Sequence, residues 1–204
     1  MPTLQVPYFS QREEEALSLY GRKACGLTSL RMVFGYYGRE TDLGRLSSLA
    51  LAKHAYTEET GWIHAGLLNT ARAVGLHGFR INYSQLSESD LPQAVNAFKK
   101  EGASEEEIGR FKESFEFTSK HRAIDDLKRL IDQGIPVITS MEKSYAQTSA
   151  SHMVVVMGYE GDDLIINDPW DFGSRFKVPS DEFERHWTKR AIVIYDGGEE
   201  PHAV

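Results

Sequence analysis

The chain has 204 residues, about the length of one domain, and its 41% hydrophobic and 26% charged residues are typical of a globular protein with a buried core. Thirty acidic residues against 23 basic ones give a net charge of −7, which repels phosphate and argues against nucleic acid as a partner. No apolar stretch is long enough to cross a bilayer, and the N-terminus lacks the basic start and apolar run of a secretory signal. We therefore expect a cytoplasmic protein with no membrane partner.

The first half of the chain is predicted to be mostly helical. Residues 1–10 are expected to be extended, because Pro7 interrupts a short apolar run, and residues 12–23 are expected to form a polar loop with three consecutive glutamates. From Cys25 to Gly38, apolar side chains at helical spacing surround most of the helix, which predicts a buried central helix. Two further helices and a short strand are expected, at residues 42–53, 62–74 and 78–84 in that order.

The second half has a different pattern and predicts a sheet. Residues 86–120 are strongly charged, and Ser104 and Glu107 have the spacing of a capping box, so we expect a solvated helical insertion here. Apolar periodicity then predicts an amphipathic helix, followed by strands, two of which are joined by a turn at Gly161 and Asp162. The expected elements are a helix at 123–133, strands at 135–141, 153–159 and 164–167, a short helix at 183–187 and a last strand at 191–195. This order indicates one α+β domain over residues 1–204, with helices first and a mostly antiparallel sheet after them.

Cys25 is the only cysteine, which excludes an internal disulfide and a cysteine-rich zinc site. A lone cysteine is usually a small buried apolar residue, but this one stands at the predicted start of the central helix. There the helix dipole and free backbone N–H groups lower a thiol pKa, and Gly26 would let a substrate backbone approach closely. Cys25 is therefore a candidate nucleophile, and we expect neither a metal nor another cofactor.

Seven histidines could supply the base that a cysteine nucleophile needs. His152 is singled out because it stands where a loop rich in serine and threonine, residues 144–151, enters an apolar strand. Four others lie in polar, exposed surroundings and two lack an acidic neighbour at a useful spacing. We interpret these six as surface or structural residues: His54, His121, His186 and His202 in the first group, His64 and His77 in the second.

The strand that follows ends in Asn167, Asp168 and Pro169. With the turn at residues 161–162, Asp168 lies opposite the start of the strand that begins near His152. A carboxylate at this place would fix the orientation of the imidazole and stabilise its charged form. Because neighbouring residues of a strand point to opposite faces, only one of Asn167 and Asp168 can orient His152.

A series of short motifs is spread over most of the chain outside the charged segment. They are Val6-Pro7-Tyr8-Phe9-Ser10-Gln11, Ala24-Cys25-Gly26-Leu27-Thr28-Ser29-Leu30, Tyr36-Tyr37-Gly38, Gly134-Ile135-Pro136-Val137, Ser151-His152-Met153-Val154-Val155, Asn167-Asp168-Pro169, and Phe183 with Trp187. In this order and spacing they resemble the double-glycine (bacteriocin) leader peptidase family, a branch of the papain-like cysteine peptidases, in the stand-alone form that is found without a transporter.

The resemblance implies a papain-like fold, with Cys25 as the nucleophile on the central helix, His152 as the base and Asp168 as the orienting acid. It further implies that Gln11 donates its side-chain amide to the oxyanion hole beside the backbone N–H of Cys25, and that the glutamate-rich loop between them bulges out. The implied activity is hydrolysis of peptide bonds in a peptide or protein substrate, through an acyl-enzyme.

Other interpretations remain open from the sequence. The same triad would serve an acyl or amide transferase of the transglutaminase type, because a fold fixes the site and not the acceptor. A catalytically inactive binding module could also retain the fold. The segment with Glu13, Glu14 and Glu15 is either a solvated charged run or the rim of a substrate cleft that favours basic groups. The sequence does not indicate an oligomeric state.

Overall fold

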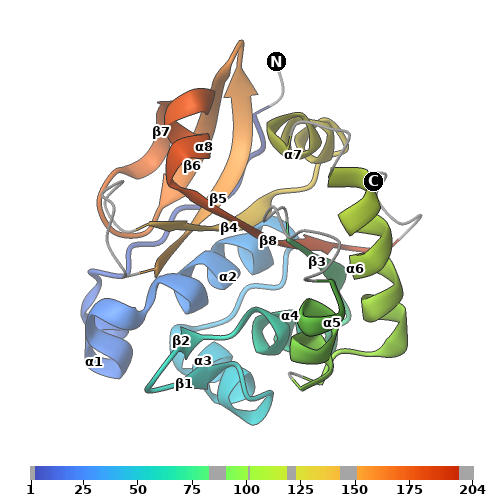
Figure 1. The fold of residues 1–204 in the computed structure, drawn as a ribbon. Coiled ribbons are helices and arrows are strands. Elements are labelled where there is room, and N and C mark those ends of the chain that lie inside the picture. Colours follow the sequence, from blue (N-terminus) through green and yellow to red (C-terminus); the bar gives the residue numbers. More distant parts are fainter. Residues whose placement is uncertain (1–2, 83–90, 101, 119–122, 143–150, 198–204) are drawn as a thin grey trace.

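The structure is a computed structural model that describes residues 3–82, 91–100, 102–118, 123–142 and 151–197. A six-stranded sheet runs through the middle of the molecule in the order β3-β8-β4-β5-β6-β7 (Figure 1). Every neighbouring pair of strands is antiparallel, so the predicted α+β fold with a mostly antiparallel sheet is confirmed. The strands of this sheet are β3 (His77–Asn82), β4 (Val137–Glu142), β5 (Ser151–Glu160), β6 (Asp163–Asp168), β7 (Gly173–Pro179) and β8 (Trp187–Tyr195).

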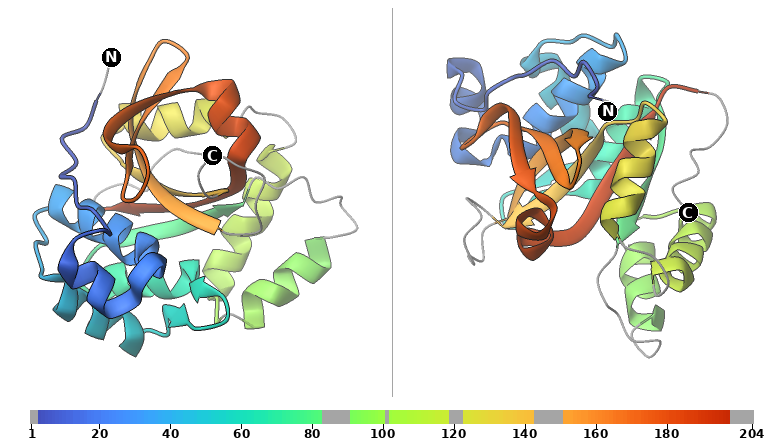
Figure 2. Two further views of the ribbon diagram at one scale, coloured as in Figure 1. Left: turned by 90° about the vertical axis from the view of Figure 1, so that its left-hand side faces the viewer. Right: turned by 90° about the horizontal axis from the view of Figure 1, so that it is seen from above.

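Helices cover both faces of this sheet (Figures 1 and 2). They are α1 (Glu14–Tyr20), α2 (Cys25–Tyr36), α3 (Leu43–Ala52), α4 (His64–Ala73), α5 (Leu91–Lys100), α6 (Glu105–Thr118), α7 (Ala123–Asp132) and α8 (Ser180–His186). A 3-10 turn, η1 (Gly21–Lys23), precedes α2, and a small hairpin of β1 (Tyr56–Thr57) and β2 (Gly61–Trp62) precedes α4. Among the described residues, none of the helices is both long and apolar enough to span a membrane.

The core is divided into two main layers by the sheet, because side chains alternate between its faces. Along β5, Met153, Val155 and Met157 pack with α2, α3 and α4, whereas Val154 and Val156 pack with α7. The predicted central helix is α2, and most of its side chains are buried from the first turn to Phe34. This burial holds the first residue of α2 at a fixed place against the end of the sheet.

The segment between Gln11 and Cys25 differs from the expected loop, since α1 and η1 fill most of it. A turn precedes α1: the Glu13 carboxylate accepts from the Ser10 N–H, and the Glu13 N–H donates to the Ser10 carbonyl. The carboxylates of Glu13 and Glu15 also have partners within the chain, at Arg31 and at the N–H of Gly44.

Helices α5 and α6 occupy the described part of the charged segment, and the predicted capping box is confirmed. The Ser104 N–H donates to Glu107 at 2.8 Å and the Glu107 N–H to the Ser104 hydroxyl at 3.2 Å. Glu107 also pairs with Arg72 of α4, and the Arg80 guanidinium of β3 lies over the Phe98 ring of α5. The two helices therefore rest on one edge of the sheet.

Candidate active site

Cys25 is the first residue of α2, and its side chain is partly exposed. Burial of the sulfur raises the pKa of the thiol, but three neighbours lower it. His152 acts through a hydrogen bond and its charge, and Met153 and Gly26 act through their backbone N–H groups. The net shift of the Cys25 pKa is downward. The thiolate that a nucleophilic cysteine requires is thus favoured at this position.

Gly26 has a different role from the one expected. A Cβ atom at this position would lie 2.6 Å from Cγ of Trp62, so the indole of Trp62, and not a substrate backbone, occupies the space beside it. Trp62 is fixed there by a hydrogen bond from its ring N–H to the carbonyl of Lys23. The rings of Tyr20 and Tyr56 lie 4.9 and 5.0 Å from its ring centre. This aromatic cluster forms one side of the start of α2.

His152 lies between Cys25 and Asp168. Its Nε2 is 2.7 Å from Oδ1 of Asp168, and the imidazole is hydrogen-bonded to the Cys25 thiol. Because Asp168 engages Nε2, Nδ1 is the ring nitrogen left to face the sulfur. Burial lowers the pKa of His152, but the hydrogen bonds and charges of Asp168 and Cys25 outweigh it and raise that pKa to about 10.

Asp168 is almost fully buried and receives three hydrogen bonds on one oxygen. Besides His152, the backbone N–H groups of Trp170 and Asp171 donate to Oδ1 at 2.7 and 3.3 Å. Burial raises the pKa of Asp168, whereas the His152 contact and these two donors lower it, with a net downward shift. The carboxylate therefore stays ionised beside the imidazole. Sequence reasoning missed the two backbone donors, although an aspartate before a proline is a signal of such a turn.

The prediction that only one of Asn167 and Asp168 reaches His152 is confirmed. Asn167 points away: its Nδ2 donates to the Val6 carbonyl at 3.3 Å, and its Oδ1 accepts from the Arg175 N–H at 2.9 Å. The predicted turn at residues 161–162 is also correct, because Glu160 pairs with Asp163 across the hairpin.

Gln11 is buried and lies next to the turn that holds Asp168. Its backbone N–H donates to the Pro169 carbonyl at 2.9 Å, and the Ser10 hydroxyl donates to the same carbonyl at 3.4 Å. The adjacent Arg12 guanidinium lies over the Trp170 ring and 3.5 Å from Asp171. Thirteen residues lie between Gln11 and Cys25, and α1 and η1 account for ten of them, while Gln11 itself stays beside the Asp168 turn.

The other histidines lie away from this constellation in the described residues. His186 was expected on the surface, but it is buried, with its two ring nitrogens 3.0 Å from Glu142 and 3.4 Å from Glu182. His64 places Nε2 2.7 Å from the Ser140 hydroxyl. His54 is exposed and His77 stacks on Tyr195, whereas His121 and His202 lie outside the described residues.

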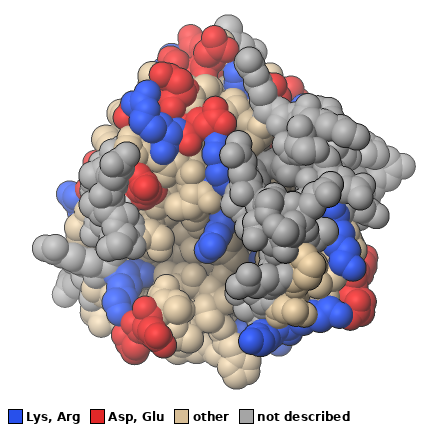
Figure 3. Space-filling view, in the orientation of Figure 1, with Lys and Arg blue, Asp and Glu red and all other residues tan. Residues whose placement is uncertain are grey.

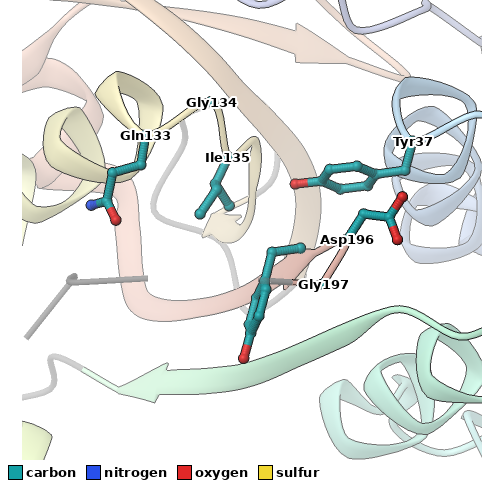
Figure 4. A pocket seen from close by; sticks show the side chains of 7 residues that line it. Tyr37, Gln133, Gly134, Ile135, Asp196 and Gly197 are labelled. Carbon is teal, nitrogen blue, oxygen red and sulfur yellow. The ribbon is translucent and has the colours of Figure 1, made fainter. Parts of the chain in front are cut away.

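A separate hollow of about 210 Å³ lies at the opposite end of α2 (Figure 4). The residues that line it are Tyr37, Gln133, Gly134, Ile135, Tyr195, Asp196 and Gly197. Since α2 has 12 residues, its two ends are roughly 18 Å apart, and this hollow is not part of the Cys25 site. In the described part of the chain, no group of three or more metal-binding side chains is present.

Comparison with known proteins identifies what this fold and constellation resemble. The model of the Peptidase_C39 like family matches residues 3–193. No curated protein matches. Among solved structures, a double glycine motif protease from an AMS/PCAT transporter, in complex with its leader peptide, is 21% identical with a TM-score of 0.54, and the match covers 96% of this chain and 95% of that one.

Two further solved structures have the same fold. A proposed C39-like peptidase from Bacillus anthracis is 17% identical with a TM-score of 0.59, over 98% of this chain and 100% of that one. The peptidase domain of Streptococcus ComA, a bifunctional ABC transporter of a quorum-sensing pathway, is 19% identical with a TM-score of 0.51, over 85% and 91%.

Proposed function

This chain belongs to the Peptidase_C39 like family of cysteine peptidases, and on that basis we propose that it hydrolyses peptide bonds with Cys25 as nucleophile, His152 as general base and acid, and Asp168 as the residue that orients His152. The observation that carries the proposal is the position of His152, which contacts the Cys25 thiol on one side and the Asp168 carboxylate on the other. A buried histidine held between a partly exposed thiol and an ionised carboxylate has the arrangement that nucleophilic catalysis requires.

The chemistry starts from a Cys25 thiolate and a His152 imidazolium. The lowered pKa of Cys25 and the raised pKa of His152 both favour this ion pair over the neutral thiol and imidazole. The sulfur attacks the carbonyl carbon of the scissile peptide bond, and the developing charge resides on the carbonyl oxygen. When the C–N bond breaks, His152 gives its proton to the leaving amine, which leaves a thioester on Cys25.

Hydrolysis of the thioester completes the cycle. The neutral imidazole of His152 takes a proton from water, whose oxygen attacks the acyl carbon, and the C–S bond then breaks to restore the thiolate. We propose that the side-chain amide of Gln11 and the backbone N–H of Cys25 donate to the oxyanion in both steps. Supporting this, Gln11 is anchored beside Asp168, and the N–H groups of the first turn of a helix have no partner within the helix.

The substrate class proposed is a peptide or an extended segment of a protein. The double glycine motif protease among the similar structures holds a leader peptide, which makes an extended peptide a reasonable first substrate for this chain. The helical segment over residues 86–120 remains a proposed insertion, and the cytoplasmic location remains a prediction.

Alkylation of the single thiol tests the nucleophile directly. With a thiolate–imidazolium pair, iodoacetamide should modify Cys25 at a rate that is already maximal well below pH 8, whereas a small free thiol used as a control reaches half of its maximal rate near its pKa of about 8.5. Cys25→Ala should abolish hydrolysis of any peptide that the wild type cleaves and change the free energy of unfolding by no more than about 1–2 kcal/mol.

These two measurements, together with a search for the acyl-enzyme and an assay with added amine, separate the proposal from its alternatives. Normal turnover by Cys25→Ala, or a wild-type thiol that reacts only above pH 8, contradicts the nucleophile assignment. If the acyl-enzyme forms but peptide products appear mainly when a primary amine is added, the enzyme is a transferase, because the amine competes with water for the thioester. A reactive thiol with no acyl-enzyme from any peptide indicates a binding module.

A further inference from the structure

A row of side chains leads away from the nucleophile across the sheet. Met153 of β5 pairs with Ser140 of β4, Ser140 pairs with Arg190 of β8, and Arg190 pairs with Asn82 of β3. The row begins at the site, because the backbone N–H of Met153 hydrogen-bonds the Cys25 sulfur. Residues two apart on a strand face the same side of the sheet, so this row lies on the same face as Ile138, Val155 and Ile192. That face packs against α2, α3 and α4.

His64, the first residue of α4, reaches down to this row. Its Nε2 is 2.7 Å from the hydroxyl of Ser140, and this pair has no part in the proposed catalytic steps. Burial, and then the charges of Arg190 and Arg80, lower the pKa of His64 to about 4. The imidazole is therefore neutral at pH 7. Arg190 is placed near it by the strand register, because Arg190 pairs with Ser140, the residue that His64 contacts.

Arg190 is the exposed member of the row. Its neighbour Lys189 pairs with Glu184, and Arg80 lies over Phe98, but Arg190 makes no ion pair with any carboxylate in the described residues. Figure 3 shows acidic and basic side chains interspersed over one face of the molecule. An exposed guanidinium that has no carboxylate partner among the described residues is available to an acidic group from outside.

We propose that Arg190, together with the His64–Ser140 pair, forms a substrate subsite that binds the carboxylate of an acidic side chain close to the scissile bond. This inference rests on the proposed peptidase function and names a preference within it. One carboxylate oxygen accepts from the guanidinium of Arg190, and the Ser140 hydroxyl, held by His64, is the second donor.

The geometry sets the distance of this subsite from the reacting bond. Neighbouring strands lie about 4.8 Å apart, so Arg190, two strands from β5, is about 10 Å from the strand that contacts the thiol. An extended peptide advances about 3.3 Å per residue, which corresponds to two or three residues from the scissile bond.

The test uses the 204-residue chain and a set of peptides. In each peptide, one of the three positions on either side of the cleaved bond carries Glu, Gln or Lys. We expect one position at which wild-type kcat/KM is about five- to tenfold higher for Glu than for Gln. In Arg190→Gln this ratio should fall to about one, and in Arg190→Glu the preference should change to Lys. Arg45→Gln is the matched control, because Arg45 is 86% exposed on α3, and it should keep the wild-type ratio.

Binding of the same Glu and Gln peptides to Cys25→Ala, followed by fluorescence anisotropy, is measured in parallel and does not depend on cleavage. Cleavage of Gln peptides with no Glu preference at any position, or a preference that survives in Arg190→Gln, overturns the subsite and leaves the peptidase function standing. Failure of the wild type to cleave any peptide counts against the proposed function. In that case the ratio of the affinities for the Glu and Gln peptides, measured by anisotropy, tests the subsite alone.

Discussion

His152 shows how a single residue receives its chemistry from neighbours that are distant in the sequence. Burial alone would keep its imidazole neutral, but Asp168 and Cys25 reverse this and raise its pKa. Asp168 can act in this way because two backbone N–H groups and His152 share its charge. The ion pair therefore exists between two limits. At low pH the Cys25 thiolate is protonated, and at high pH the His152 imidazolium loses its proton.

Asp168→Asn should shift the alkaline limit of activity to lower pH. Without the negative charge, the imidazolium loses its main support, the pKa of His152 falls from about 10, and the ion pair is lost earlier as pH rises. We expect kcat/KM to drop by about tenfold or more near pH 8, with a smaller loss near pH 6. The measurement is a pH profile of kcat/KM and of the alkylation rate. Asp171→Asn is the control, since its carboxylate pairs with Arg12, and an equal shift there would point to a general field effect.

His64 should make the protein less stable in mild acid. The pKa of His64 is lowered to about 4 in the folded state from an ordinary value near 6.5, so the unfolded chain binds more protons between these values. Stability from this residue is complete above pH 6.5 and is lost as pH falls toward 4. His64→Gln should lose less free energy of unfolding over this interval than the wild type in urea titrations. Parallel curves for the two proteins would show that His64 is protonated when folded.

At the level of whole elements, the strongest sequence signals were the most reliable. Three features follow from local patterns, and each is confirmed: the apolar side chains around most of α2, the continuous apolar run of β5 and the two-residue turn before β6. Strand β7 was not predicted, because it is an edge strand with charged residues and mostly exposed side chains. Helix α1 was missed because the polar segment with three consecutive glutamates was interpreted as a loop.

The site could be predicted where it depends on short motifs and on the alternation of side chains along a strand. Cys25, His152 and Asp168 could be singled out in this way, and the structure brings them together, while their catalytic roles remain the proposal. Contacts across long sequence separations were not predictable. The packing of Trp62 on Gly26 and the burial of His186 between two glutamates are of this kind, since no local pattern encodes which side chain fills a space.

Gly26→Ala should disturb the start of α2. The new methyl group would lie 2.6 Å from the Trp62 ring, so the indole or the helix start must move, at a cost of about 1–3 kcal/mol in free energy of unfolding. Hydrolysis should fall as well, because Cys25 moves with the helix start. Gly109→Ala in α6 is the matched control: nothing lies within 4 Å of that position, and alanine there should stabilise the helix by about 0.5–1 kcal/mol.

A second variant identifies Trp62 as the cause. Adding Trp62→Leu to Gly26→Ala should recover part of the lost activity, because the smaller side chain makes room for the methyl group. If Gly26→Ala is as stable and active as the wild type, the close packing of Trp62 on the helix start is not a constraint.

On the scale of the whole molecule, the N-terminal segment, residues 3–11, connects the sheet to both parts of the site. The Leu4 N–H donates to the Met157 carbonyl on β5, the Val6 carbonyl accepts from Asn167 at the end of β6, and Gln11 ends the segment beside Pro169. Pro7 also lies against Gly35 of α2, where a Cβ would be 2.7 Å from it. The segment therefore sets where Gln11 lies, independently of how Cys25 and His152 contact each other.

Asn167→Ala separates these two parts of the site. It removes the hydrogen bond to the Val6 carbonyl and should lower the free energy of unfolding by about 1–3 kcal/mol, because buried polar groups lose their partner. Since Gln11 is displaced while the Cys25–His152 pair is kept, we expect kcat/KM to fall about tenfold or more, with the iodoacetamide rate within about twofold of the wild type. Both rates are measured well below the unfolding temperature of each variant. Asn69→Ala is the control, because the hydrogen bond of the Asn69 side chain within the described residues is to Arg72, on its own helix. A parallel fall of turnover and alkylation would instead show that the segment supports the nucleophile itself.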